Sequence, residues 1–161
     1  MGNVVKIGIA DMSIVSAGDS VMTIGLGSCV GVAIRDTVTK VGGLIHIMLP
    51  DSTSVKSNTN KYKFADTGVA ELVKQLELKG CKRERLEAKI AGGAQMFAFQ
   101  NKTDLLSVGV KNVEAVKATL RSLGIKLISE DVGENYGRTV EYFPVNGDYF
   151  VRAVGKPEKK I

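Results

Sequence analysis

The sequence predicts an α+β protein in which layered, mixed β-sheets form a sandwich-like body flanked by two main helices. Many short segments are rich in β-branched and aromatic residues and are bounded by Gly, Asp, Asn or Ser, which is typical of strands. Two longer segments place apolar residues at helical spacing. No repeat, low-complexity block or linker divides the chain, so we expect residues 1–161 to form a single domain.

The predicted strands follow one another along most of the chain. Asn146-Gly147, between the last two of them, is a strong signal for a tight hairpin turn. The expected ranges are Val4–Ile9, Val21–Ile24, Val30–Arg35, Val41–Met48, Ala88–Ala91, Leu105–Val108, Lys126–Glu130, Thr139–Phe143 and Tyr149–Val154.

The two predicted helices each carry an apolar stripe and end at a glycine. We expect Asp66 to cap the first helix and Gly80 to end it, and we expect the second to follow Asn112 and to close at Gly124. Both stripes are interpreted as core faces rather than partner surfaces. They consist of Val69, Leu72, Val73 and Leu76 in the first helix and Val113, Val116, Leu120 and Leu123 in the second.

The composition limits the chemistry. Hydrophobic residues at 44% and charged residues at 24% are ordinary globular values, which exclude a disordered chain. With 2 cysteines the chain cannot be a disulfide scaffold, and with 1 histidine it cannot hold a histidine-rich metal site. We therefore expect no cofactor and no metal, and any mechanism that needs an imidazole must use His46.

The net charge of +5 raises the question of a nucleic-acid partner. Acidic residues lie among the basic ones, as in residues 79–85, and aromatic residues make up only 6% of the chain. This favours a solvated surface of mixed sign over a nucleic-acid interface. The excess positive charge can instead favour an acidic protein partner.

Other segments indicate location and order. The start of the chain lacks the apolar run of a signal peptide, and the most apolar stretch is too short to span a bilayer. We expect a cytosolic protein with no direct membrane insertion. Residues 51–61 are expected to form a mobile loop, and residues 156–161 a loose tail.

Cys29 lies in a glycine-rich turn between two predicted strands. The segment 23–31 reads TIGLGSCVG, which is neither a dinucleotide fingerprint nor a phosphate-binding loop. Its main-chain amides, at Gly27 and Ser28, are candidate oxyanion donors. The Gly92-Gly93 pair can line a cleft or can simply form a tight turn, and the sequence alone favours the turn.

The hairpin that follows Cys29 predicts where His46 lies. If Arg35 pairs with Lys40 across a four-residue loop, Cys29 falls directly opposite His46, and directly opposed residues share a face. Burying the bulky residues of both strands together also leaves Cys29 and His46 on one face. The sequence therefore permits a Cys–His pair.

Such a pair suits nucleophilic catalysis, because an adjacent imidazolium favours a reactive thiolate. Thr23, six residues before Cys29, is a candidate to hold the other imidazole nitrogen. A structural cysteine and a structural histidine remain the alternative interpretation. Cys81 follows a helix in a charged turn and is expected to be structural.

Several short motifs follow one another along the chain: GLGSCV at residues 25–30, GLIHIMLPD at 43–51, KY at 61–62, AD at 65–66, LEAKIAGGA at 86–94, NVEAV at 112–116 and GRTV at 137–140. Together they resemble the motifs of the CheD family of chemoreceptor glutamine deamidases. The resemblance extends from about Ile7 to Val154. Two regions depart from a compact family pattern: residues 52–60 are long and polar, and residues 100–106 look longer than in many relatives. Both bear on partner contacts more than on chemistry.

The resemblance implies a fold of stacked sheets like that of bacterial deamidating toxins, and it places the catalytic cysteine, histidine and threonine on Cys29, His46 and Thr23. It implies hydrolysis of selected receptor glutamines to glutamate, methylesterase-like action in some relatives, and regulation by a CheC-type phosphatase. In this hypothesis the Cys29 thiolate attacks the carboxamide and His46 protonates departing ammonia. The alternatives are a non-catalytic adaptor that binds receptors or CheC, and a cysteine peptidase.

Overall fold

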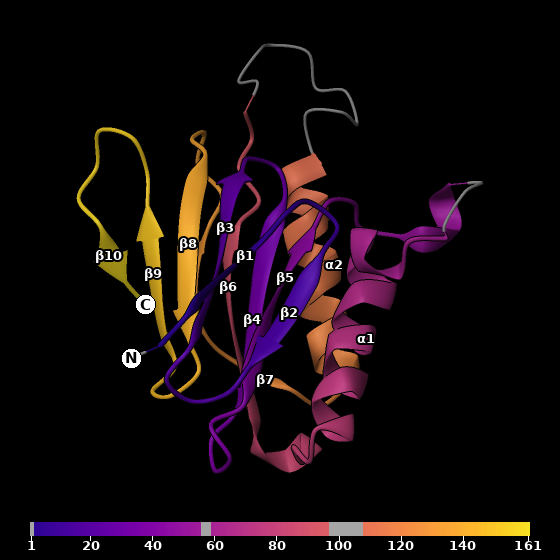
Figure 1. The fold of residues 1–161 in the computed structure, drawn as a ribbon. Helices are drawn as coiled ribbons and strands as arrows, with labels where there is room; N and C mark the ends of the chain where they lie inside the picture. The colour runs from indigo at the N-terminus through magenta and orange to yellow at the C-terminus, as the bar shows by residue number, and fades with distance from the viewer. Residues whose placement is uncertain (1, 56–58, 97–107) are drawn as a thin grey trace.

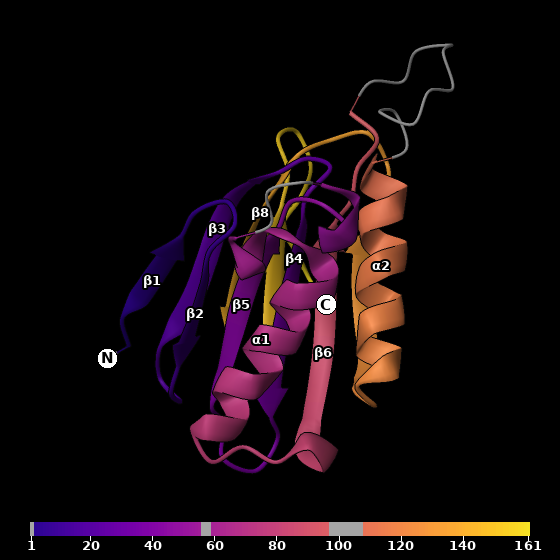
Figure 2. The same cartoon turned by 90° about the vertical axis from the view of Figure 1, so that its right-hand side faces the viewer.

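In the computed structural model, residues 2–55, 59–96 and 108–161 are described. They form three layers: an outer sheet, a central sheet and a pair of helices (Figure 1). The outer sheet has the strand order β1-β3-β8-β9-β10 and the central sheet the order β2-β5-β4-β6-β7. Figure 2, turned by 90°, shows α1 and α2 side by side in front of the central sheet. The α+β layered architecture predicted from the sequence is confirmed.

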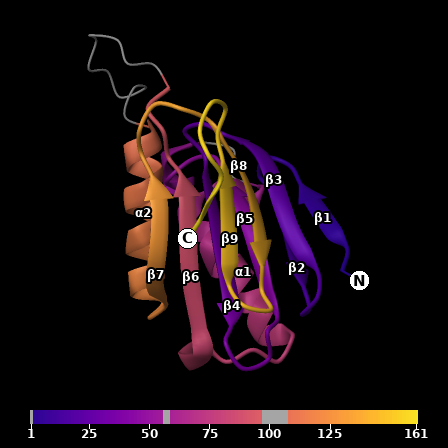
Figure 3. The ribbon, with the colours of Figure 1, turned by 90° about the vertical axis from the view of Figure 1, so that its left-hand side faces the viewer.

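The outer sheet is antiparallel except where β1 runs parallel to β3. Figure 3 shows β8 and β9 in front, with the helices behind the central sheet. The strands of the outer sheet are β1 (Val4–Ile7), β3 (Ser20–Leu26), β8 (Arg138–Phe143), β9 (Asp148–Arg152) and β10 (Lys159–Lys160).

The central sheet is antiparallel except for the parallel pair of β6 and β7. Every residue of β4 and β5 is buried, because this sheet has the outer sheet on one face and the helices on the other. Its strands are β2 (Met12–Val15), β5 (Gly42–Ile47), β4 (Val30–Asp36), β6 (Leu86–Gly92) and β7 (Lys126–Val132).

The first helix buries its predicted stripe completely, and the second buries Val116 and Leu120 while Val113 and Leu123 are partly buried. The helices are α1 (Ala65–Leu78) and α2 (Val108–Ser122), and the short 3₁₀ turns are η1 (Ser52–Ser54), η2 (Lys61–Lys63) and η3 (Arg83–Arg85). Each helix closes with a Schellman motif. The characteristic hydrogen bond runs from Cys81 N to Leu76 O (3.1 Å) at the end of α1 and from Ile125 N to Leu120 O (2.9 Å) at the end of α2. The glycine stops at Gly80 and Gly124 are therefore confirmed.

Both expected helix starts are wrong. Phe64 occupies the N-cap of α1 without a side-chain hydrogen bond. Asp66 is the second residue of the helix, and its carboxylate accepts from the amide (3.1 Å) and hydroxyl (2.8 Å) of Ser52. These bonds fasten the start of the expected mobile loop to α1. α2 begins at Val108, so Asn112 is a buried residue inside the helix.

Several strand predictions also need correction. β2 and β10 were not expected, and Val108, expected to end a strand, begins α2, while residues 105–107 lie outside the described residues. The loose tail is wrong at its end: Lys159 and Lys160 pair with β9, and the Ile161 carbonyl accepts from Lys89 Nζ at 2.6 Å. The Asn146-Gly147 hairpin between β8 and β9 is confirmed.

The register of β4 and β5 differs from the expected one by two residues. Asp36 pairs with Val41, as shown by Asp36 N to Val41 O at 2.9 Å, so the four-residue loop lies one position later in the chain than predicted. The Asp36 carboxylate fixes it there by accepting the amides of Val38 (2.7 Å) and Thr39 (3.0 Å). His46 is therefore opposite Gly31 rather than Cys29.

Candidate active site

The shift in register does not change the predicted face of the sheet on which Cys29 and His46 lie. A shift of two residues conserves the parity of a strand pair, so Cys29 and His46 still lie on the same side of the central sheet. Cys29, half-buried just before β4, packs on the hydrophobic cluster between the two sheets, and His46 bonds across that layer. Gly31 is opposite His46, and Cys29 lies two residues before Gly31, just outside β4.

Thr23 and His46 are brought together from different sheets. Thr23 Oγ1 lies 2.7 Å from His46 Nδ1, and both residues are buried. The same hydroxyl donates to the Ile7 carbonyl at 3.0 Å. Since a hydroxyl has one proton, Thr23 must accept from His46, which places the imidazole proton on Nδ1.

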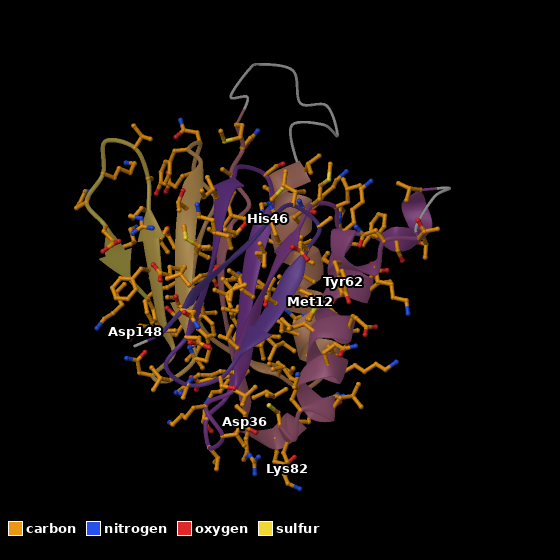
Figure 4. The ribbon with its side chains drawn as sticks, in the orientation of Figure 1. Met12, Asp36, His46, Tyr62, Lys82 and Asp148 are labelled. Atoms are coloured by element: carbon orange, nitrogen blue, oxygen red, sulfur yellow. The ribbon has the colours of Figure 1, made fainter. Side chains whose placement is uncertain are left out.

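His46 Nε2 consequently carries a free lone pair. This nitrogen is buried and has no hydrogen-bond partner among the described residues. An imidazole whose Nδ1–H is anchored and whose Nε2 is open has the arrangement of a general base. His46 lies near the end of the sheet where β3 passes into β4, opposite to the end that holds Asp36 (Figure 4).

A bulge in β3 separates Thr23 from the turn that carries Cys29. The pairing of β3 with β8 shifts between Thr23 and Leu26, so both of these side chains point inward while Ile24 and Gly25 face solvent. Gly25 has a φ of +81°, which favours glycine at the centre of the bulge. The bulge thereby aims the Thr23 hydroxyl at His46 and leads the chain over to the central sheet.

The turn at Cys29 is held by neighbouring backbone and by α2. The Cys29 carbonyl accepts from Gly93 N at 2.7 Å, and a side chain at Gly92 would collide with that carbonyl. The Gly92-Gly93 pair is therefore more than a tight turn, because it supports the candidate nucleophile.

From the sequence, Asn112 is expected only at the start of a helix, which misses its role at the site. Its buried amide Nδ2 donates to Ser28 O at 2.9 Å and to Met48 O at 3.0 Å. One side chain thus ties the Cys29 turn to the end of the strand that carries His46. A buried asparagine within a helix was the available signal, but nothing in the sequence indicated what it would contact.

The two candidate oxyanion donors differ. The Gly27 amide donates to Gly25 O at 3.1 Å, so it is already occupied, and this expectation needs correction. Within the described ranges, the Ser28 amide donates no backbone hydrogen bond, and the Cys29 amide donates to its own sulfur. Among the described residues neither amide bonds to another backbone carbonyl, so these two amides are the better candidates. Among the described residues, no three His, Cys, Asp or Glu side chains lie close enough to hold a metal ion together.

Burial sets the resting protonation of the pair. It raises the pKa of the Cys29 thiol and lowers the pKa of His46 to about 4. Both shifts favour the uncharged forms of the two groups near neutral pH. Proton transfer from sulfur to Nε2 then belongs to the reaction itself.

The chain was next compared with known proteins. The family model described as CheD chemotactic sensory transduction matches residues 48–153. The chain belongs to the CheD family. The matched region starts two residues after His46, and similarity over the rest of the chain comes from individual relatives.

CheD relatives match along the whole chain. The protein of Lachnoclostridium phytofermentans named "Probable chemoreceptor glutamine deamidase CheD" is 53% identical over 161 residues, 100% of both chains. "Chemoreceptor glutamine deamidase CheD" of Halalkalibacterium halodurans is 48% identical over 162 residues, again 100% of both chains. No helix within the described residues is long and apolar enough to cross a membrane.

The pKa shifts predict how the Cys29 thiol reacts with iodoacetamide. Because the thiolate is the nucleophile and burial disfavours it, Cys29 should alkylate more slowly at pH 7 than a free peptide thiol, and its rate should still be rising above pH 9. Mass spectrometry of the Cys29 peptide measures the rate, and the Cys81 peptide, whose thiol pKa is also raised by burial, is an internal reference. A rate that levels off below pH 7 would contradict the uncharged resting pair.

Proposed function

We propose that this protein hydrolyses the side-chain amide of glutamine residues in chemoreceptors, with Cys29 as nucleophile, His46 as general base and acid, and Thr23 as the residue that orients His46. The observation that carries this proposal is the anchored imidazole: Nδ1 is bound to Thr23 while Nε2 is open on the face shared with Cys29. Relatives that match the full chain carry the name of the same activity.

The first half of the reaction forms a thioester. As Cys29 Sγ attacks the carboxamide carbon, its proton moves to His46 Nε2, and the carbonyl oxygen becomes an oxyanion near the Ser28 and Cys29 amides. The carbon–nitrogen bond then breaks, the Nε2 proton passes to the leaving nitrogen, and ammonia departs. Burial favours this last transfer, because it makes the imidazolium a stronger acid.

The second half restores the enzyme. His46 Nε2, again neutral, removes a proton from water as the oxygen attacks the thioester carbon. The carbon–sulfur bond breaks, the thiolate recovers its proton from Nε2, and the product is a glutamate side chain. Throughout the cycle the Nδ1 proton remains directed at Thr23, so one ring nitrogen handles every proton.

Two further elements of the proposal rest on the family resemblance. They are a regulatory CheC-type phosphatase as a partner and recruitment of the protein to membrane receptors. A non-catalytic adaptor would share both elements but would release no ammonia, so the assay below separates the two functions.

Replacing the two cysteines separately tests the nucleophile. Cys29→Ala should lower ammonia release from a purified chemoreceptor cytoplasmic domain by about a thousandfold or more, since no other group can form the thioester. Cys81→Ala is the matched control and should retain activity, because Cys81 lies between Thr39 and the helical core. Mass increases of about one dalton at receptor glutamines provide the readout, and near-normal turnover by Cys29→Ala would contradict the mechanism.

Two substitutions at Thr23 test the orienting hydrogen bond. Thr23→Ser keeps an acceptor for His46 Nδ1 and should retain most of kcat, whereas the isosteric Thr23→Val removes it and should lower kcat by about ten- to a hundredfold. KM should change little in either variant. Equal kcat values for the serine and valine variants would show that the hydrogen bond does not orient the base.

A further inference from the structure

A groove on the outer sheet includes the β3 bulge, whose Gly25 is four residues before Cys29. It has a volume of about 510 Å³ and is lined by Ile24 and Gly25 of the β3 bulge, by residues 136–139 at the start of β8 and by residues 152–154 at the end of β9. These segments lie side by side because Leu26 pairs with Arg138 and Thr139 with Arg152. The groove is therefore at the end of the sheet from which the chain passes to Cys29.

The wall of this groove is apolar and exposed. Ile24 is 57% exposed and Val154 is 101% exposed. Tyr136, which lines the same groove, is half-buried. Ile24 is exposed because the β3 bulge that directs Thr23 inward directs Ile24 outward. The same backbone feature thus builds the candidate active site and one wall of the groove.

The groove also gathers positive charge. Arg138 lies with its guanidinium 4.5 Å from the Tyr136 ring centroid, and Lys156 Nζ lies 4.7 Å from the same ring. Arg138 Nη2 is buried and has no hydrogen-bond partner among the described residues, while Nε is bound to Asp131. Arg152 adds a third cation, which is exposed and forms a surface ion pair with Glu158 (3.1 Å).

We propose that this groove binds the chemoreceptor helix beside its target glutamine, with Ile24, Tyr136 and Val154 against apolar side chains and Arg152 and Lys156 against a carboxylate. The proposal rests on the function proposed above. Charge complementarity selects the occupant: receptor glutamines that have already been converted carry carboxylates, and the exposed cations Arg152 and Lys156 lie at the groove.

The distance along the chain limits where that carboxylate lies. Gly25 and Cys29 are four residues apart, so their Cα atoms are separated by at most about 14 Å. On a helix rising about 1.5 Å per residue, this corresponds to about nine residues. The wall of the groove at Gly25 would therefore face residues within about two and a half turns of the glutamine.

Charge reversal at one exposed residue tests the groove by binding alone. In a Cys29→Ala background, which prevents turnover, Arg152→Glu should weaken binding of a purified chemoreceptor cytoplasmic domain roughly tenfold. Arg121→Glu makes the same charge change on the exposed surface of α2 and should weaken it less than about twofold. Thermal melting confirms folding, which Arg152→Glu should hardly affect because surface ion pairs contribute little to stability.

A second arm identifies the receptor group. We then replace by glutamine the receptor glutamates that lie within about nine residues of the modified glutamine. With this receptor domain, the Arg152→Glu variant and the parent should bind with equal affinity. Equal weakening by Arg152→Glu and Arg121→Glu would overturn the proposal, because only long-range charge would then be acting. A changed oligomeric state of Arg152→Glu alone would assign the groove to a second copy of the chain and would also overturn it.

Ammonia release by the unmodified chain distinguishes the two proposals. If Arg152→Glu weakens receptor binding more than Arg121→Glu but the receptor domain is not deamidated, the groove proposal is supported and the catalytic proposal is contradicted. If the receptor domain is deamidated but the two variants bind it equally, the catalytic proposal is supported and the groove proposal is contradicted.

Discussion

The single proton of the Thr23 hydroxyl determines how the candidate active site is organised. It is donated to the Ile7 carbonyl, so the Thr23 oxygen can only accept from His46 Nδ1. Three strands from two sheets therefore fix one tautomer: β1 supplies the carbonyl, β3 the hydroxyl and β5 the imidazole. The parallel pairing of Ile7 with Thr23 and the β3 bulge both serve this arrangement.

Burial explains why a neutral pair suits this chemistry. A dry site makes the resting thiolate and imidazolium costly, and the pKa values of Cys29 and His46 both shift toward the uncharged forms. The low pKa of His46 also has a consequence for stability. Since the unfolded chain takes up a proton near pH 6.5 and the folded chain only near pH 4, the stability contribution is present above pH 6.5 and is lost as the pH falls toward 4.

The sequence predicted the face of the site better than its register. Alternation along β4 and β5 decided the shared side of Cys29 and His46, and that result survives any shift by two residues. The position of the hairpin loop depends on how the Asp36 side chain bonds to nearby amides, which a pattern of apolar residues does not report. The same limit applies to Asp66, which binds Ser52 instead of capping its helix.

Contacts between distant segments were the least predictable features. Asn112 follows the helical pattern of α2 but acts through bonds to Ser28 and Met48, which lie far from it in the sequence. The C-terminal residues are too polar to predict a strand, yet β10 pairs with the edge of the outer sheet. Both features depend on tertiary packing. Local propensity carries no information about it.

The tautomer of His46 is the most direct test of the account, and the presence of 1 histidine in the chain makes the measurement unambiguous. Nitrogen-15 NMR of the imidazole distinguishes a protonated ring nitrogen from an unprotonated one. At pH 7 the account predicts a neutral ring with the proton on Nδ1, and protonation of Nε2 only near pH 4. A ring protonated on Nε2 at pH 7, or one charged at that pH, would contradict it.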